Sequence, residues 1–193
     1  MSGNHVVILP GWNGSGPTHW QTLWELNHPE YVRVAVGDWR SVHCSDWVLA
    51  LDRTVLALSG NVILVAHSLG CLAVAWWASS RTDCRRWVQG AMLVAPPDLS
   101  AAAGALPALA SFTPLPLARL PFPSLLIASE DDPYASIDAQ AGFARQWESE
   151  FVNVGAAGHI NADSGHGPWP EGERHFQRFQ AEVGLPSLAA IRW

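Results

Sequence analysis

The chain has 193 residues, a formal net charge of −6 and 49% hydrophobic residues, which suits a single α/β domain over 1–193 with a sizeable core. The acidic balance and the lack of a basic block argue against nucleic acid or an anionic membrane as a partner. All eleven basic residues are arginine. This excludes Schiff-base and PLP catalysis, P-loop phosphate binding and Ser-Lys dyads, because each of them needs a lysine.

The N-terminal segment has no cationic region, and its first apolar run, Val6 to Leu9, is too short for a signal peptide or a membrane span. Three cysteines, Cys44, Cys71 and Cys84, form no C-x-x-C pair. Their odd number argues against a disulfide framework, and their spacing argues against a zinc site. We therefore expect a cytoplasmic protein with reduced thiols and no metal.

Short apolar runs alternate with amphipathic stretches, which is the pattern of a βαβα fold. The predicted strands cover 5–10, 31–37, 61–67, 88–95, 123–129 and 151–155. The predicted helices cover 18–27, 45–59, 69–80, 136–149 and 171–183. Right-handed crossovers would give a three-layer α/β/α sandwich around a mostly parallel, six-stranded sheet, with ligands at the carboxyl ends of the strands. The segment from Pro97 to Pro121 interrupts this alternation and predicts a short helical insertion over the site.

A glycine-rich loop follows the first predicted strand, and it has two interpretations. Gly11 to Gly16, with Asp38 at the end of the next strand, has elements of a dinucleotide-binding fold. However, the glycines are spaced G-x-x-G-x-G in place of G-x-G-x-x-G, and the bulky Trp12 would obstruct a pyrophosphate. The Tyr-x-x-x-Lys pair of short-chain dehydrogenases is also impossible without lysine. We prefer the interpretation in which this loop supplies a backbone amide to an oxyanion.

The segment Ala66-His67-Ser68-Leu69-Gly70 joins a buried strand to a helix. It is a relaxed form of the G-x-S-x-G nucleophile elbow, in which a tight strand-to-helix turn exposes the serine and small residues let the backbone pass closely. Ala66 stands where glycine is commoner. An ordinary turn with a helix-capping serine is the alternative, but the position between strand and helix favours Ser68 as a nucleophile. His67 is expected to point away and pack.

If Ser68 is a nucleophile, an acid and then a histidine should follow it at later strand ends. His159 follows the last predicted strand and is the candidate base, with His166 as the weaker candidate. Asp131 and Asp132 follow the strand 123–129, and either could be the acid, because adjacent carboxylates cannot both point at one imidazole.

These residue types fit one chemistry. A serine hydroxyl is a poor nucleophile at neutral pH, so a neutral imidazole takes its proton during attack and returns it to the leaving group, while a carboxylate fixes the imidazole tautomer. The oxyanion that forms needs two backbone amides. Leu69 would supply one of them, and the loop after the first strand would supply the other, with Trp12 as the first choice and Asn13 as the second.

Five residues are candidates to line the substrate pocket: Asn13, His19, Trp20, Asn161 and Trp169. Helix packing would explain His19 and Trp20 equally well. Eleven tryptophans are many for this length, and bulky core filling is the plain explanation, with some of them lining a cleft.

Motifs along nearly the whole chain support a family resemblance. They are Leu9-Pro10-Gly11-Trp12, His19-Trp20-Gln21, Asp38-Trp39, Asp46-Trp47-Val48, Ala66-His67-Ser68-Leu69-Gly70, Ser129-Glu130-Asp131-Asp132-Pro133-Tyr134, Gly158-His159-Ile160-Asn161 and Gly167-Pro168-Trp169-Pro170. With these motifs the chain resembles the small serine hydrolases of the retinoblastoma-binding protein 9 and YdeN group. The resemblance implies a minimal α/β-hydrolase fold with little or no lid and carboxylesterase-like or aminopeptidase-like activity. It also implies a triad of Ser68, Asp132 and His159. The name-giving Leu-x-Cys-x-Glu interaction does not transfer, because the corresponding segment ends in Ala73.

We therefore predict a serine hydrolase that cleaves small carboxylic ester, amide or thioester bonds through an acyl-Ser68 intermediate. Its partner would be a small acyl substrate, with no metal, organic cofactor, nucleic acid or membrane, and the sequence indicates no oligomeric state. Two alternatives are a non-catalytic binding protein on a hydrolase scaffold and a dinucleotide-binding oxidoreductase.

Overall fold

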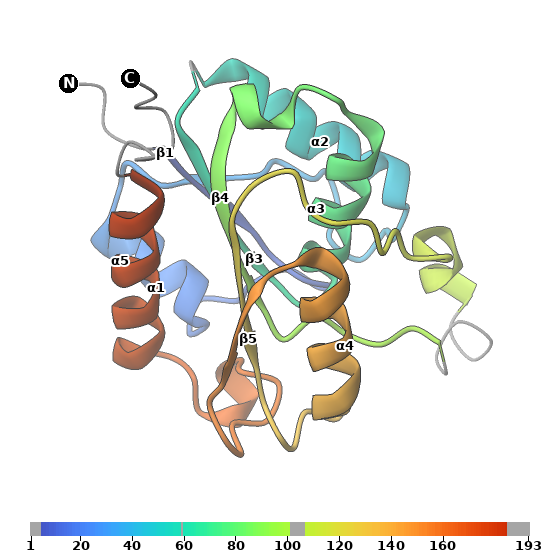
Figure 1. Ribbon diagram of the computed structural model, residues 1–193. Coiled ribbons are helices and arrows are strands. Elements are labelled where there is room, and N and C mark those ends of the chain that lie inside the picture. Colours follow the sequence, from blue (N-terminus) through green and yellow to red (C-terminus); the bar gives the residue numbers. More distant parts are fainter. Residues whose placement is uncertain (1–4, 59, 101–106, 185–193) are drawn as a thin grey trace, which may run out of the picture.

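The computed structural model describes residues 5–58, 60–100 and 107–184 (Figure 1). Strands and helices alternate along these residues, as the apolar periodicity predicts. The elements are β1 (His5–Leu9), α1 (Trp20–Asn27), β2 (Val32–Arg33), α2 (Cys44–Ala57), β3 (Val62–His67), α3 (Leu69–Ser80), β4 (Val88–Val94), β5 (Ser124–Ala128), α4 (Ile137–Trp147), β6 (Glu150–Asn153) and α5 (Pro170–Gly184), with short 3-10 helices η1 (Cys84–Arg86), η2 (Pro107–Phe112) and η3 (Ala162–Ser164).

The strands form one sheet in the order β2-β1-β3-β4-β5-β6, and each pair of neighbours is parallel. The interior strands β3 and β5 are buried along their whole length, which explains their mostly apolar sequences. All carboxyl ends of the strands meet at one edge of the sheet, and the loops that follow β1, β3, β5 and β6 therefore lie together there.

Helices cover both faces of the sheet, with α1 and α5 on one side and α2, α3 and α4 on the other (Figure 1). Each layer has its own apolar core, rich in tryptophan. Trp47, Trp77 and Trp147 lie in the core beneath α2, α3 and α4. Trp20 and Trp24 lie in the core beneath α1 and α5. The predicted three-layer α/β/α sandwich is confirmed, and most of these tryptophans serve as core filling.

The second strand is much shorter than the predicted 31–37. Only Val32 and Arg33 pair with β1, opposite Val7 and Ile8. Beyond them the amide of Val36 bonds to the carbonyl oxygen of Val34, two residues back, so the chain turns away from the sheet. The apolar residues that follow Arg33 therefore belong to a partly buried turn.

The interrupting segment 97–121 contains the short helix η2, as the sequence predicted, while its residues 101–106 lie outside the described part. This helix packs against α2 and α3. The hydroxyl of Ser111 accepts a hydrogen bond from the amide of Cys44 at 3.1 Å, and Trp76 Nε1 donates to the carbonyl oxygen of Phe112 at 3.0 Å. A placement over the site stays a prediction. In the part of the chain that the structure describes, no helix combines the length and apolar character needed to cross a bilayer.

Candidate active site

Ser68 lies at the junction of β3 and α3, with φ 54° and ψ −126°. Residues other than glycine rarely adopt such a backbone, and it costs about 1–3 kcal/mol where the surroundings enforce it. Here the amide of Ser68 donates to the carbonyl oxygen of Val94, and its own carbonyl oxygen accepts from the amide of Cys71, both at 2.9 Å. The strand-to-helix turn is therefore as tight as a nucleophile elbow requires.

Two glycines allow the loop after β1 to touch this turn. A Cβ on Gly70 would lie 2.5 Å from the carbonyl oxygen of Leu9 and 2.6 Å from that of Pro10. A Cβ on Gly11 would lie 2.7 Å from the Cβ of Ser68. Contacts this short are not tolerated between real atoms, so glycine is required at both positions, and the loop is held directly beside the serine.

Ser68, His159 and Asp132 form a continuous row of hydrogen bonds. The hydroxyl of Ser68 lies 2.8 Å from His159 Nε2, and His159 Nδ1 lies 3.0 Å from each carboxylate oxygen of Asp132. The side chain of Asp132 is wholly buried. Because an ionised carboxylate can only accept, Nδ1 carries the imidazole proton and Nε2 is free to accept the proton of the serine.

Asp131 has a different environment from its neighbour. Its carboxylate is exposed and accepts from the amide of Gly158 at 2.7 Å and from the hydroxyl of Ser129 at 2.9 Å. These two bonds, the one from Gly158 first, hold the pKa of Asp131 below its ordinary value. Asp131 thus ties the loop after β5 to the loop after β6, while Asp132 contacts His159.

His67 supports the loop that carries His159. Its ring is buried against that of His159, and its Nε2 donates to the carbonyl oxygen of His159 at 2.9 Å. Burial, with His159 and His19 close by, holds the pKa of His67 well below its ordinary value. His67 is therefore a neutral ring that holds the backbone of His159.

The amides of Trp12 and Asn13, the two loop candidates for an oxyanion hole, differ in their hydrogen bonding. The amide of Asn13 donates to the carbonyl oxygen of Trp39 at 3.1 Å. Within the described residues, the amides of Trp12 and Leu69 have no hydrogen-bond acceptor. Leu69 is the first residue of α3, where backbone amides lack partners inside the helix. Trp12 and Leu69 thus present free donors beside Ser68.

Two of the five predicted pocket residues lie in the core, which contradicts the prediction. The side chain of Trp20 is fully buried, and its Nε1 donates to the carbonyl oxygen of Ile160 at 2.9 Å. Trp169 is 5% exposed and packs against both Trp20 and Trp24. Large aromatic rings beneath the loop after β6 support that loop from below, where a substrate cannot reach them.

The other three have different roles. His19 is buried, and its Nδ1 accepts from the amide of Gln21 at the start of α1. Burial, together with the nearby charge of Arg33, lowers the pKa of His19 to about 4. Asn161 accepts from the amide of Ser164 and caps η3. Asn13 is exposed with φ 67°, whereas Asn161 is half-buried.

Tyr134 was not among the predicted site residues, although it belongs to the Ser-Glu-Asp-Asp-Pro-Tyr motif. Its side chain is 59% exposed, and its ring meets that of His159 edge to face with 4.5 Å between the centroids. An aromatic residue two positions after a strand-end acid was the available signal. Trp12, at 37% exposure, is the other large exposed ring near the serine.

The remaining candidates have packing roles. His166 Nδ1 lies 3.2 Å from the hydroxyl of Ser164, and its ring packs on Trp169. Cys71 is fully buried, which raises the pKa of its thiol. A Cβ on Gly14 would lie 3.1 Å from the ring of Trp39, so this glycine of the loop after β1 packs against that ring.

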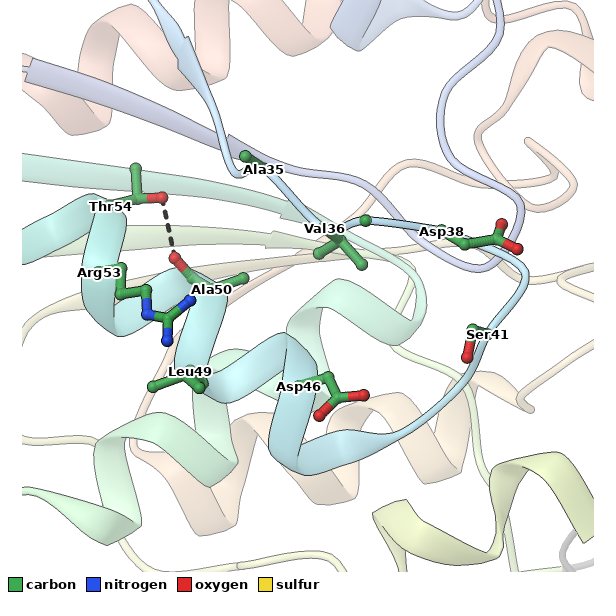
Figure 2. Close-up of a pocket in the computed structure, with 10 residues that line it drawn as sticks. Ala35, Val36, Asp38, Ser41, Asp46, Leu49, Ala50, Arg53 and Thr54 are labelled. Atoms are coloured by element: carbon green, nitrogen blue, oxygen red, sulfur yellow. Dashed lines mark hydrogen bonds between the residues drawn. The ribbon is translucent and has the colours of Figure 1, made fainter.

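A cavity of about 540 Å³ lies elsewhere, between the chain that follows β2 and one face of α2 (Figure 2). Its lining residues are Ala35, Val36, Gly37, Asp38, Ser41, Asp46, Leu49, Ala50, Arg53 and Thr54. None of the predicted site residues is among them. In the described residues, no three His, Cys, Asp or Glu side chains are grouped so that they could hold a metal ion.

A parallel sheet that presents a serine on the turn after a central strand, with an acid and a histidine at later strand ends, defines an α/β-hydrolase. Comparison with known proteins agrees with this class. A family model described as serine hydrolase matches residues 6–178, so the chain belongs to the serine hydrolase family.

Solved structures extend this comparison. A YdeN-like hydrolase from Pectobacterium atrosepticum is 32% identical over 95% of this chain and 94% of its own, with a TM-score of 0.84. The ydeN gene product of B. subtilis is 21% identical over 92% and 99%, with a TM-score of 0.71. The esterase RhEst1 from Rhodococcus sp. is 16% identical over 94% and 90%, with a TM-score of 0.63, which shows a shared fold. No curated protein matches the chain.

Proposed function

We propose that this hydrolase cleaves small carboxylic esters, amides or thioesters through an acyl-Ser68 intermediate. His159 acts first as base and then as acid, and Asp132 orients it. The observation that carries the proposal is the hydrogen-bonded row from Ser68 through His159 to Asp132, at 2.8 Å and 3.0 Å. Membership of the serine hydrolase family supports it independently.

Acylation follows from this geometry. Ser68 Oγ attacks the carbonyl carbon while its proton moves to His159 Nε2, and the carbonyl electron pair moves onto oxygen. The amides of Trp12 and Leu69 donate to this oxyanion, and the loss of one such donor typically costs about 3 kcal/mol in the transition state. The carboxylate of Asp132 stabilises the imidazolium and stays ionised.

Acylation is completed when the electron pair on the oxyanion re-forms the carbonyl, and deacylation then repeats the transfers with water as the nucleophile. The bond from the carbonyl carbon to the leaving group breaks, and the proton on His159 Nε2 passes to the leaving atom. A water molecule then gives a proton to Nε2 and attacks the acyl carbon. Ser68 Oγ leaves with that proton, which releases the carboxylic acid and restores the enzyme.

A labelling experiment tests the proposal. The wild-type protein and Ser68→Ala are treated with a fluorophosphonate probe and assayed with p-nitrophenyl acetate and an aminoacyl anilide, which separate esterase-like from aminopeptidase-like activity. Ser79→Ala is the matched control, because Ser79 is an exposed serine on the same helix whose hydroxyl donates to the carbonyl oxygen of Trp76.

Wild type and Ser79→Ala should be labelled and should hydrolyse ester, whereas Ser68→Ala should do neither and should keep its circular dichroism spectrum. Undiminished turnover by Ser68→Ala would refute the mechanism. A folded wild type that is neither labelled nor active on either substrate would also refute it, in favour of a binding protein on a hydrolase scaffold.

A further inference from the structure

Tyr134 is an exposed aromatic ring in contact with the proposed catalytic base. The rings of Tyr134 and His159 meet edge to face, with 4.5 Å between their centroids and 68° between their planes. More than half of the side chain is nevertheless open to solvent. A large exposed ring beside reacting groups is a surface to which apolar ligand atoms can bind.

The backbone of Tyr134 is fixed on both sides. Its amide donates to Asp132 Oδ1 at 2.9 Å, and its carbonyl oxygen accepts from the amide of Asp98 at 3.0 Å. The ring therefore projects from a segment that is bonded to the acid of the proposed triad. The backbone is thus held, and the edge-to-face contact places the ring against His159, as a specificity element requires.

The proposed mechanism determines which part of the substrate lies near this ring. The oxyanion must point toward the amides of Trp12 and Leu69, and the leaving atom must lie within hydrogen-bond reach of His159 Nε2 to receive its proton. The leaving group therefore extends along the His159 side of the site. Tyr134 contacts the ring of His159 and so lies on this side of the site.

The charges on this side disfavour an anionic leaving group. Asp131, two positions before Pro133 on the same loop, is an exposed carboxylate bonded to Gly158. Glu130, next to it, is exposed as well. An apolar, uncharged group that can rest against the ring is the chemistry that this surface fits best.

We propose that Tyr134 binds the leaving group of the substrate, and that preferred substrates carry an uncharged aryl group on the departing alcohol, amine or thiol. This inference rests on the acyl-Ser68 mechanism proposed above. An aromatic pair at this position should raise kcat/KM by about two- to tenfold over an alkyl leaving group of similar acidity.

The test compares benzyl acetate with ethyl acetate, because both form the same acetyl-enzyme and release alcohols of similar acidity. Tyr134→Leu removes the ring and keeps apolar bulk, while Tyr134→Phe keeps the ring. Phe151→Leu is the matched control, since Phe151 is an exposed aromatic residue on β6. Deacetylation of the enzyme is measured from the burst and steady phases with p-nitrophenyl acetate.

In Tyr134→Leu, kcat/KM for benzyl acetate should fall by about two- to tenfold with little change for ethyl acetate. Tyr134→Phe and Phe151→Leu should keep the wild-type ratio. The deacetylation rate should stay constant in all variants, because the leaving group has departed before that step.

Equal losses on both esters with slower deacetylation would show that Tyr134 only supports His159, and would overturn the proposal. An unchanged ratio in Tyr134→Leu would overturn it too. If wild type had no Ser68-dependent turnover of either ester, the proposed function itself would fail, and that result is distinct from a loss of selectivity alone.

Discussion

Replacing Asp132 by asparagine should nearly abolish activity while leaving the shape of the site intact. Both carboxylate oxygens of Asp132 lie 3.0 Å from His159 Nδ1. The amide of Tyr134 donates to Oδ1, so the oxygen of asparagine stays in that place and its amide nitrogen replaces Oδ2. There the nitrogen would donate to Nδ1 and move the imidazole proton to Nε2, which then cannot accept from Ser68. Such a tautomer change lowers kcat roughly ten-thousandfold, which corresponds to about 5.5 kcal/mol in the activation barrier.

The assay is initial-rate hydrolysis of p-nitrophenyl acetate, with the rate of fluorophosphonate labelling as a second readout. Asp131→Asn is the matched control. Its amide oxygen can still accept from the amide of Gly158 and the hydroxyl of Ser129, so kcat should stay within a few-fold of wild type while the thermal unfolding midpoint falls. If Asp132→Asn kept more than a tenth of wild-type kcat, or if Asp131→Asn were the more damaged variant, the assignment of the acid would be wrong.

Two further predictions concern stability. The pKa of His19 is about 4 in the folded protein and 6.5 in an unfolded chain. Between pH 6.5 and pH 4 His19 is therefore protonated in the unfolded chain and neutral in the folded protein. The free energy of unfolding should therefore fall by about 3 kcal/mol as the pH drops from 7 to 4, and His19→Asn should reduce this dependence in urea titrations; an unaltered pH dependence would contradict the buried neutral ring. Gly70→Ala would place a Cβ 2.5 Å from the carbonyl oxygen of Leu9 and 2.6 Å from that of Pro10. Gly70→Ala should lower the urea midpoint by an amount equivalent to about 1–3 kcal/mol and reduce esterase activity. A wild-type midpoint with wild-type activity would show that the loop after β1 can move aside.

The buried strands were predictable because they are continuous apolar runs, and most helices because their apolar residues recur with the period of a helix. Helix α3 is apolar on nearly all sides, and its position directly after the serine turn indicated it. The second strand was not predictable, because alternation at Val32, Val34 and Val36 suits a strand and a partly buried turn equally. Pairing with β1 distinguishes the two, and pairing depends on residues far away in the sequence.

The candidate site was also predictable in part. Strand-end placement and chain order sufficed to select Ser68 and His159, since parallel strands bring their carboxyl ends to one edge. The residues alone did not separate Asp131 from Asp132, because that choice depends on which carboxylate the following turn buries. The burial of Trp20 and the exposure of Tyr134 could not be predicted for a similar reason. The identity of an aromatic residue does not indicate whether the fold buries it or exposes it.

Hydrogen bonds between two loops set the spacing of the proposed acid and base. The amide of Glu130 donates to the carbonyl oxygen of Gly155, and the hydroxyl of Ser129 accepts from the amide of Ala157. Asp131 adds its bond to Gly158. The acid loop and the base loop are thereby joined at three successive points just before His159.

A second set of contacts holds the base loop from the opposite side. His67 Nε2 donates to the carbonyl oxygen of His159, and Trp20 Nε1 donates to that of Ile160. The imidazole is thus fixed through the backbone on both sides, by residues that need not touch a substrate. This explains why His67, Asp131 and Trp20, which stand within the motifs that suggested the family, act on the site through the position of His159.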